Sequence, residues 1–320
     1  MSATPGTCLV VMYHYVRDSE ATPFPAIRAL PPALFDQQLD WLEREYTLLD
    51  PLSLEAAVAA RGTLPANAAT LTFDDGFIDH HATVLPMLAD RGHTGLFFIT
   101  YETIGPEPRM VGVHKTHLLL AALGAEVFGG AVLEQRDREL AATPGAGPAR
   151  VFGADSWEHA DERAIKNLLN YELPFDVADR LLDALFERHL GDSREFARAL
   201  YLDERMIREM SAAGMVFGYH TRSHRMLSRL SPAEQDRELR DGVNWIRGLT
   251  GQRQVPFCFP WGGPGTYTPE TLRLLQQHGY SAAYNTVRRR VDVASDGMFE
   301  LPRLDTRDLP PYTTGEPVVG

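Results

Sequence analysis

A helix that ends at a glycine and leads into a short apolar strand recurs along the chain. The unit is seen in PMLADRGHTGLFFIT, MIREMSAAGMVFGYH and TLRLLQQHGYSAAYNT, where Gly92, Gly214 and Gly279 follow the last helical turn. That position favours a left-handed residue. Strands that alternate with helices pair in parallel, because each helix carries the chain back to the starting edge of the sheet. The repetition predicts an α/β fold around a parallel sheet.

Seven short apolar runs are the candidate strands, namely LVVMY, ATLTF, GLFFI, MVFGY, PFCF, SAAYN and MFEL. Continuous apolar runs are typical of parallel strands that are covered on both faces. Seven strands suit a barrel as well as an open sheet. Between them, residues 35–46 show helical spacing, and the capping box SPAE at 231–234 begins a helix that we expect to end at Gly251.

The 320 residues, of which 44% are hydrophobic, suffice for one large domain over residues 1–320. Between residues 103 and 209 the strand pattern gives way to a long helical tract. A tract of this length between two strands is an insertion, and we expect residues 103–209 to form a lid or a partner surface.

The net charge of −12 argues against a nucleic-acid partner or an anionic membrane surface, since both need clustered cations. The two cysteines, Cys8 and Cys258, suggest buried apolar fillers rather than a disulfide framework. MSATPGT lacks a basic leader region, and the apolar run after it is too short for a membrane span. We therefore expect a cytoplasmic protein without a membrane span.

Two acids, Asp74 and Asp75, directly follow the strand ATLTF. Adjacent carboxylates at the end of a buried strand repel each other, but they are well placed to hold a cation in the cleft of a parallel sheet. The alternative is a solvated Asp-Asp-Gly turn. The strand MVFGY likewise ends in His220, with His224 four residues later. Two imidazoles and one carboxylate form a metal site with open positions, and the combination favours this interpretation.

LTFDDGF and HTRSH resemble the first two motifs of the polysaccharide deacetylases, the NodB-homology family or carbohydrate esterase family 4. The resemblance implies a distorted (β/α)7 barrel and a metal-dependent enzyme that removes acetyl groups from N-acetylated sugars. By position, Asp74 would be the general base, and Thr221 would stabilise a loop. The metal ligands would be Asp75, His220 and His224, with Zn²⁺ as the expected ion.

FCFPWGG resembles the third motif of the family. The resemblance implies that the backbone N–H of Trp261 faces the oxyanion and that Trp261 and Pro260 line the substrate pocket. Members often carry an arginine that braces the base where this chain has Cys258, and a thiol cannot replace it. Arg303, in LPRL, resembles the arginine of the fourth motif and is expected to pair with Asp74. The alternative is an ordinary surface arginine.

The general acid of the family is usually a histidine near the C-terminus, yet no histidine follows His278, which ends a helix in QQHGY. In a barrel the first and last strands are neighbours, so a residue of the first strand can take its place. Members related to the poly-N-acetylglucosamine deacetylases have this motif ahead of the first. The resemblance therefore implies that His14, after LVVMY, is the acid, with Tyr13 beside it contacting substrate. A buried structural His14 is the alternative.

Four further histidines have weaker signals. His114 and His117 suit a second metal pair, a substrate-binding edge or, more commonly, a solvated helix start. His80 and His81 are expected at the polar start of a helix.

The expected function is metal-dependent removal of the N-acetyl group from an amino sugar. Because polymer deacetylases act outside the cell, the expected substrate is a small cytoplasmic sugar conjugate. One alternative is hydrolysis of another non-peptide C–N bond, for example deformylation. The other is a catalytically silent carbohydrate-binding homologue, which the missing third-motif arginine favours.

Overall fold

The computed structural model describes residues 6–142 and 162–313. Contacts within the chain divide it into two compact units, which are described separately. The first contains Met1–Asp18, Ala29–Glu107 and Leu200–Gly320, and the second contains Ser19–Arg28 and Pro108–Ala199.

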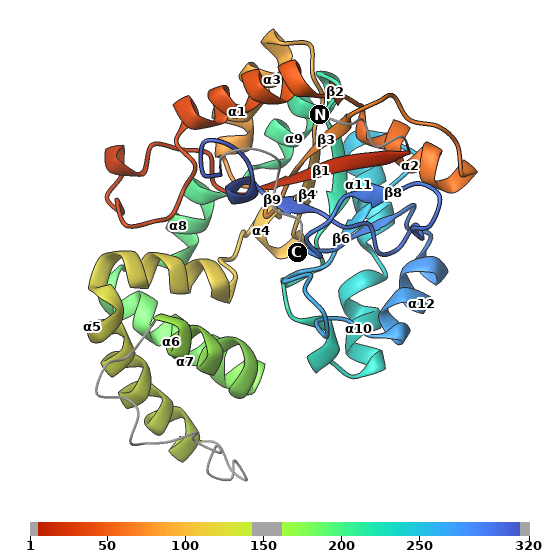
Figure 1. Cartoon of the computed structure of the whole chain (residues 1–320). Coiled ribbons are helices and arrows are strands. Elements are labelled where there is room, and N and C mark those ends of the chain that lie inside the picture. Colours follow the sequence, from red (N-terminus) through yellow and green to blue (C-terminus); the bar gives the residue numbers. More distant parts are fainter. Residues whose placement is uncertain (1–5, 143–161, 314–320) are drawn as a thin grey trace. The chain divides into compact units, whose positions relative to one another are not determined.

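The first unit is built on one sheet of nine strands (Figure 1). They are β1 (Thr7–Tyr13), β2 (Thr47–Leu48), β3 (Ala68–Phe73), β4 (Leu96–Ile99), β5 (Val216–Tyr219), β6 (Phe257–Cys258), β7 (Ala283–Tyr284), β8 (Val291–Asp292) and β9 (Leu304–Asp305). The main path runs β7-β6-β5-β4-β3-β1-β8, with β2 beside β3 and β9 beside β1. All neighbours pair in parallel except β1 and β8. This arrangement confirms the predicted α/β class with a distorted seven-stranded barrel.

Helices accompany the strands in the first unit. They are α1 (Pro32–Glu45), α2 (Pro51–Ala60), η2 (His80–Val84), α3 (Leu85–Asp90), α4 (Tyr101–Ile104), α9 (Glu204–Ala212), η5 (Leu227–Arg229), α10 (Pro232–Leu239), α11 (Gly242–Thr250), α12 (Pro269–His278) and η6 (Thr306–Asp308). The glycines after α3, α9 and α12 have φ values of 71°, 90° and 79°, as the repeated unit predicted.

The segment after β7 closes the barrel. Leu301 forms a parallel bridge with Tyr284 of β7, and Leu304 of β9 pairs with Val11 of β1. The expected strand MFEL is therefore reduced to the single bridge at Leu301. This closure places residues 301–305 between β7 and β1.

The helix expected to run from the capping box to Gly251 is broken, which corrects the prediction. The Tyr280 hydroxyl donates to the Leu239 carbonyl at 2.7 Å. A Cβ at Gly242 would come within 2.2 Å of the same hydroxyl oxygen. Tyr280 therefore takes the carbonyl that ends α10 and requires a glycine where α11 begins, which helical periodicity does not reveal.

The second unit is helical. It contains η1 (Ser19–Ala21), α5 (Gly112–Ala142), α6 (Glu162–Asn167), η4 (Leu168–Glu172), α7 (Phe175–His189) and α8 (Ser193–Leu200). The α5 segment is interrupted at Gly124, where φ is 75° and ψ is 164°. Residues 143–161 of the expected insertion lie outside the described residues.

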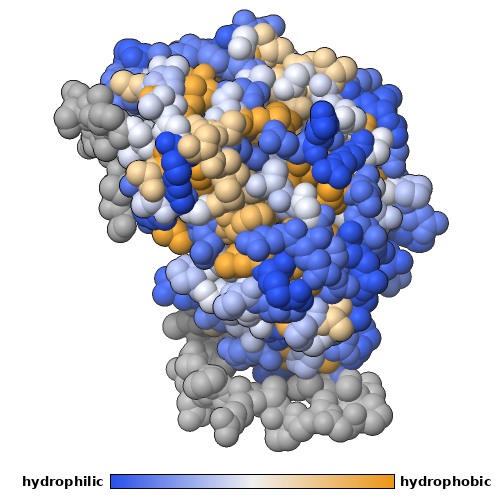
Figure 2. Space-filling model, turned by 90° about the vertical axis from the view of Figure 1, so that its right-hand side faces the viewer, coloured by the Kyte–Doolittle hydropathy of each residue, from blue (hydrophilic) through white to orange (hydrophobic). Residues whose placement is uncertain are grey.

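One described segment, Gly112–Glu139, is long and apolar enough, by length and composition, to cross a membrane. Of its most apolar 18 residues, 33% are buried. A core helix of a soluble protein passes the same test, so the absence of a membrane span stays a prediction. Figure 2 shows one face of the molecule, which is mostly hydrophilic with smaller apolar areas.

Glu55 of α2 is a buried acid in the first unit. It accepts hydrogen bonds from the Ser281 hydroxyl at 3.0 Å and from the Tyr284 hydroxyl at 3.1 Å. Burial raises the pKa of Glu55 to about 7, against 4.5 for the ordinary side chain. The folded protein therefore holds a proton that the unfolded chain releases between these pH values, and its stability falls as pH rises through this window.

We expect Glu55→Gln to remove this loss, because the amide does not ionise; its oxygen can accept from one hydroxyl and its NH2 group can donate to the other. At pH 5 the free energies of unfolding should be similar, whereas at pH 8 the variant should be more stable by about 3 kcal/mol, the equivalent of the pKa shift. Denaturant unfolding at both pH values measures the difference, with the exposed acid variant Asp90→Asn as control. An equal effect of Glu55→Gln at both pH values would contradict the assignment.

Candidate active site

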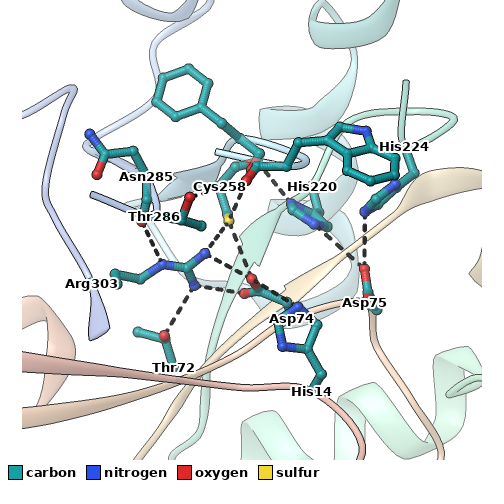
Figure 3. Close-up of polar contacts among 12 residues, drawn as sticks. His14, Thr72, Asp74, Asp75, His220, His224, Cys258, Asn285, Thr286 and Arg303 are labelled. Atoms are coloured by element: carbon teal, nitrogen blue, oxygen red, sulfur yellow. Dashed lines mark hydrogen bonds and ion pairs between the residues drawn. The ribbon is translucent and has the colours of Figure 1, made fainter. Parts of the chain in front are cut away.

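The predicted site residues gather at one edge of the sheet (Figure 3). Asp74 and Asp75 follow β3, His220 follows β5, and Cys258 ends β6. Parallel strands bring their carboxyl ends to the same edge, so side chains far apart in sequence meet there. His14 follows β1, which pairs with β3 in register from Cys8–Ala68 to Tyr13–Phe73.

Asp75, His220 and His224 form a compact set of metal-ligating groups. The Asp75 Oδ1 atom lies 3.5 Å from His220 Nε2 and 3.2 Å from His224 Nε2. The Nδ1 atom of His220 lies 2.8 Å from the Cys258 carbonyl oxygen, which can only accept, so Nδ1 carries the proton and Nε2 is left as a ligand. Burial, together with the neighbouring His224, lowers the pKa of His220 to about 4 and keeps the ring neutral. The set fits a divalent cation.

A second group of three, Asp74, His220 and Cys258, also meets the distance requirement among the described residues. It fits a metal less well. Burial raises the pKa of the Cys258 thiol, which keeps it protonated, and only a thiolate is a good ligand. The Arg303 guanidinium also occupies both oxygens of Asp74 and would repel a cation. We therefore assign the candidate metal site to Asp75, His220 and His224.

Asp74 is engaged by Arg303 through two parallel hydrogen bonds. The Nη1 and Nη2 atoms of Arg303 donate to Oδ1 and Oδ2 of Asp74, both at 2.8 Å. Both side chains are almost completely buried. Burial alone would raise the pKa of Asp74, but the Arg303 charge outweighs it and lowers the pKa below its usual range. Asp74 is consequently ionised at neutral pH.

The surroundings fix the guanidinium of Arg303. Its Nε donates to the Asn285 carbonyl at 3.0 Å, and its Nη1 donates to the Thr72 hydroxyl at 3.1 Å. Its Nη2 donates to Cys258 Sγ at 2.9 Å. Cys258 thus accepts a hydrogen bond from the arginine. The segment 301–305, which closes the barrel, brings Arg303 to Asp74.

His14 lies on the more open side of Asp74. Its Nε2 is 3.9 Å from Asp74 Oδ2, and its side chain is 42% exposed. The buried structural role is therefore excluded for this side chain. Tyr13 points the other way: it is fully buried, with its ring against Phe35 and Phe73 at centroid distances of 5.1 and 5.2 Å. This corrects the expectation that Tyr13 contacts substrate, because successive side chains of a strand face opposite sides.

Four non-glycine residues of the site have a left-handed backbone. Their φ values are 75° for Asp75, 66° for Thr221, 59° for His224 and 69° for Trp261. Such conformations cost about 1–3 kcal/mol each and persist where the surrounding structure enforces them, often at functional sites. The Trp261 ring lies 6.0 Å from the His224 ring, and its carbonyl accepts from the Thr286 hydroxyl at 3.1 Å. Pro260, before it, is buried.

Comparison with known proteins supports the same interpretation. The family model described as "Polysaccharide deacetylase" matches residues 176–283, which contain His220, His224 and Trp261. The acid motif at Asp74 and Asp75 lies before the matched segment and completes the site in space. Over this segment the chain is similar to the polysaccharide deacetylase family. No curated protein sequence matches it.

Solved structures with this fold include three that cover most of the chain. The Streptococcus pyogenes deacetylase PplD, in complex with acetate, has 20% identity and a TM-score of 0.57, covering 94% of this chain and 93% of its own. IcaB from Ammonifex degensii has 19% identity and a TM-score of 0.57, covering 95% and 93%. The BpsB deacetylase domain from Bordetella bronchiseptica has 14% identity and a TM-score of 0.54, covering 95% and 97%. At these identities the similarity shows the fold.

The remaining histidines lie outside this candidate site. His278, at the end of α12, lies with its Nε2 2.8 Å from Asp236 Oδ1 of α10. The rings of His114 and His117 lie 5.9 Å apart, and within the described ranges neither belongs to a group of three metal-ligating side chains. His80 and His81 begin η2, but His80 is fully buried rather than at a polar start.

Glu238 of α10, which sequence reasoning missed, holds the loop that carries the two candidate histidine ligands. Its Oε2 accepts from the backbone N–H groups of Arg222 at 3.0 Å and Ser223 at 2.9 Å, and its Oε1 accepts from the Ser223 hydroxyl at 2.6 Å. Thr221 also stabilises this loop, since its hydroxyl accepts from the His224 N–H at 2.9 Å. A helical glutamate looks like any solvated residue in the sequence.

We expect Glu238→Ala to weaken metal binding about 10- to 100-fold, because groups that orient ligands contribute effects of this size. Competition with a chromophoric chelator measures the affinity directly, without an activity assay. Arg237→Ala, which removes an exposed neighbour on the same helix, should leave it unchanged. Equal metal affinity of Glu238→Ala and wild type would show that Glu238 does not hold the loop for the ligands.

Proposed function

We propose that the chain is a metal-dependent amide hydrolase that removes the N-acetyl group from an N-acetylated amino sugar. The observation that carries the proposal is the division between two adjacent carboxylates. Asp75 faces the imidazoles of His220 and His224, whereas Asp74 faces the guanidinium of Arg303. One carboxylate is thereby available as a ligand and the other as a base.

The proposed ion is Zn²⁺, which suits one carboxylate and two neutral imidazoles with open positions. When bound there, it would supply Lewis-acid polarisation of the substrate carbonyl and of water. Asp75, His220 and His224 would hold it.

Asp74 is the proposed general base. An ionised carboxylate offers about four lone-pair positions, so two hydrogen bonds from Arg303 leave capacity for a water molecule. The pair with Arg303 keeps the carboxylate charged and fixes its orientation. Asp74 then takes the proton from water as its oxygen attacks the amide carbon.

Two further groups complete the proposed reaction. The backbone N–H of Trp261 would donate to the oxyanion, in a segment whose left-handed conformation redirects the backbone. His14 would protonate the leaving amine, which otherwise departs poorly. Its partly exposed side chain beside Asp74 supports this role, since a group that meets substrate must be accessible.

We further propose a small amino-sugar conjugate in the cytoplasm as the substrate. The net charge of −12 suits a neutral amide substrate that yields a cationic amine. Deformylation of a similar amide is the second candidate, since the same groups serve any small acyl chain. The silent alternative rested on the missing arginine at Cys258, and the contact of Arg303 with Asp74 opposes it.

We expect Asp74→Asn to lower kcat by about 10²–10⁴-fold while metal still binds, because the amide cannot take the proton but Asp75 and the histidines remain. Acetate and formate release would be measured on N-acylated amino sugars, their nucleotide- and lipid-linked conjugates, and their polymers. This panel also decides substrate size and acyl group.

Asp308→Asn is the matched control, since Asp308 is a buried acid paired with Arg288. It should retain turnover. Turnover of Asp74→Asn close to that of wild type would refute the role of Asp74, and full loss of metal would show that Asp74 is itself a ligand.

A further inference from the structure

His80 is a buried imidazole whose polar contact is with the backbone of His14. Its Nε2 lies 2.9 Å from the His14 carbonyl oxygen, which accepts, so Nε2 carries the proton. The ring is fully buried, with the rings of Phe73, Phe77 and Phe97 at centroid distances of 5.6, 5.9 and 5.5 Å. Burial lowers its pKa to about 4, which keeps it a neutral donor.

The opposite ring nitrogen, Nδ1, has no hydrogen-bond partner in the part of the chain that the structure describes. An unpaired buried polar atom costs about 1–3 kcal/mol. An apolar side chain would fill an aromatic cage without this cost. The contact with His14 is therefore the feature that an imidazole, and not a phenyl ring, provides.

Further contacts hold the segment around His14 on both sides. The Asp79 carboxylate accepts from the Val16 N–H at 3.2 Å and from Arg17 Nε at 2.7 Å. The Asp74 N–H donates to the Tyr13 carbonyl at 2.9 Å, before His14 in the chain. The backbone on both sides of His14 is thus fixed to residues 74–80, which contain the proposed base.

The side chain of His14, in contrast, is only loosely held, since its Nε2 lies 3.9 Å from Asp74 Oδ2, beyond hydrogen-bond distance. Its location then depends on its backbone. A displacement of about 1 Å in a reacting group can cost about 10²-fold in rate.

We propose that His80 is a positioning residue for the general acid: its hydrogen bond to the His14 carbonyl, supported by Asp79, sets the height of the His14 imidazole above the site. This inference rests on the proposed function. His80 itself touches neither substrate nor metal ligands in this role.

The test uses two substrates that differ in their need for an acid. An N-acetyl amino sugar needs its leaving amine protonated, whereas an aryl acetate ester releases a phenolate without help. We expect His80→Phe, which preserves the packing, to lower kcat on the amide about 10- to 100-fold with little change in KM or ester hydrolysis. Metal affinity should equal that of wild type.

Three companion variants sharpen the test. His80→Gln, which retains a donor near Nε2, should recover most of the amide turnover. The double variant with His14→Ala should be no slower than His14→Ala alone, because His80 acts through His14. His81→Gln, which alters the partly exposed neighbour bound to Glu209, should behave as wild type.

Equal losses on amide and ester, or additive effects in the double variant, would overturn the positioning role and leave the proposed function intact. A His14→Ala variant with normal amide turnover would instead refute His14 as the acid, and the role of His80 with it. Wild-type protein that releases no acyl group from any amide would refute the proposed function itself.

Discussion

The buried ion pair between Asp74 and Arg303 is the interaction on which the site depends. A buried carboxylate next to Asp75 would otherwise favour its protonated form, because burial and like charge both penalise ionisation. The paired hydrogen bonds from Arg303 reverse this preference. Breaking such a pair leaves a buried charge uncompensated, at a cost of about 3–5 kcal/mol. The proposed base chemistry and the local stability are therefore coupled at Asp74.

Barrel closure explains how a chain with Cys258 in the third motif retains this pair. Leu301 bridges to β7 and Leu304 pairs with β1, so the intervening Arg303 enters the site from the segment that joins the last strand to the first. The same closure places the end of β1, with His14, beside the acids that follow β3. Side chains at the seam of a barrel can thus come from either end of the sequence, which is why motif order can differ between proteins of one fold.

Much of this could be predicted from the sequence, because the strand ends and the spacing of the acid and histidine motifs determine which side chains share an edge. The remainder depended on tertiary contacts. The break before Gly242 comes from a contact with Tyr280. The direction of the Tyr13 side chain depends on which residues of the strand face the core, and the sequence leaves this ambiguous because a tyrosine stands on either side of His14. Glu238 and His80 were not recognised as supports, because they bind mainly backbone groups, which leave no signature in side-chain patterns.

The central claim is that the two adjacent acids have different partners, with Asp75 on the metal and Asp74 on Arg303. An anomalous difference map at the zinc edge, from crystals grown with Zn²⁺, tests it most directly. The account predicts one peak at bonding distance from Asp75 and the Nε2 atoms of His220 and His224, about 2.0–2.2 Å, with the Asp74–Arg303 pair intact. A peak bonded to Asp74 and the Cys258 sulfur, or no peak between Asp75 and the two histidines, would contradict it.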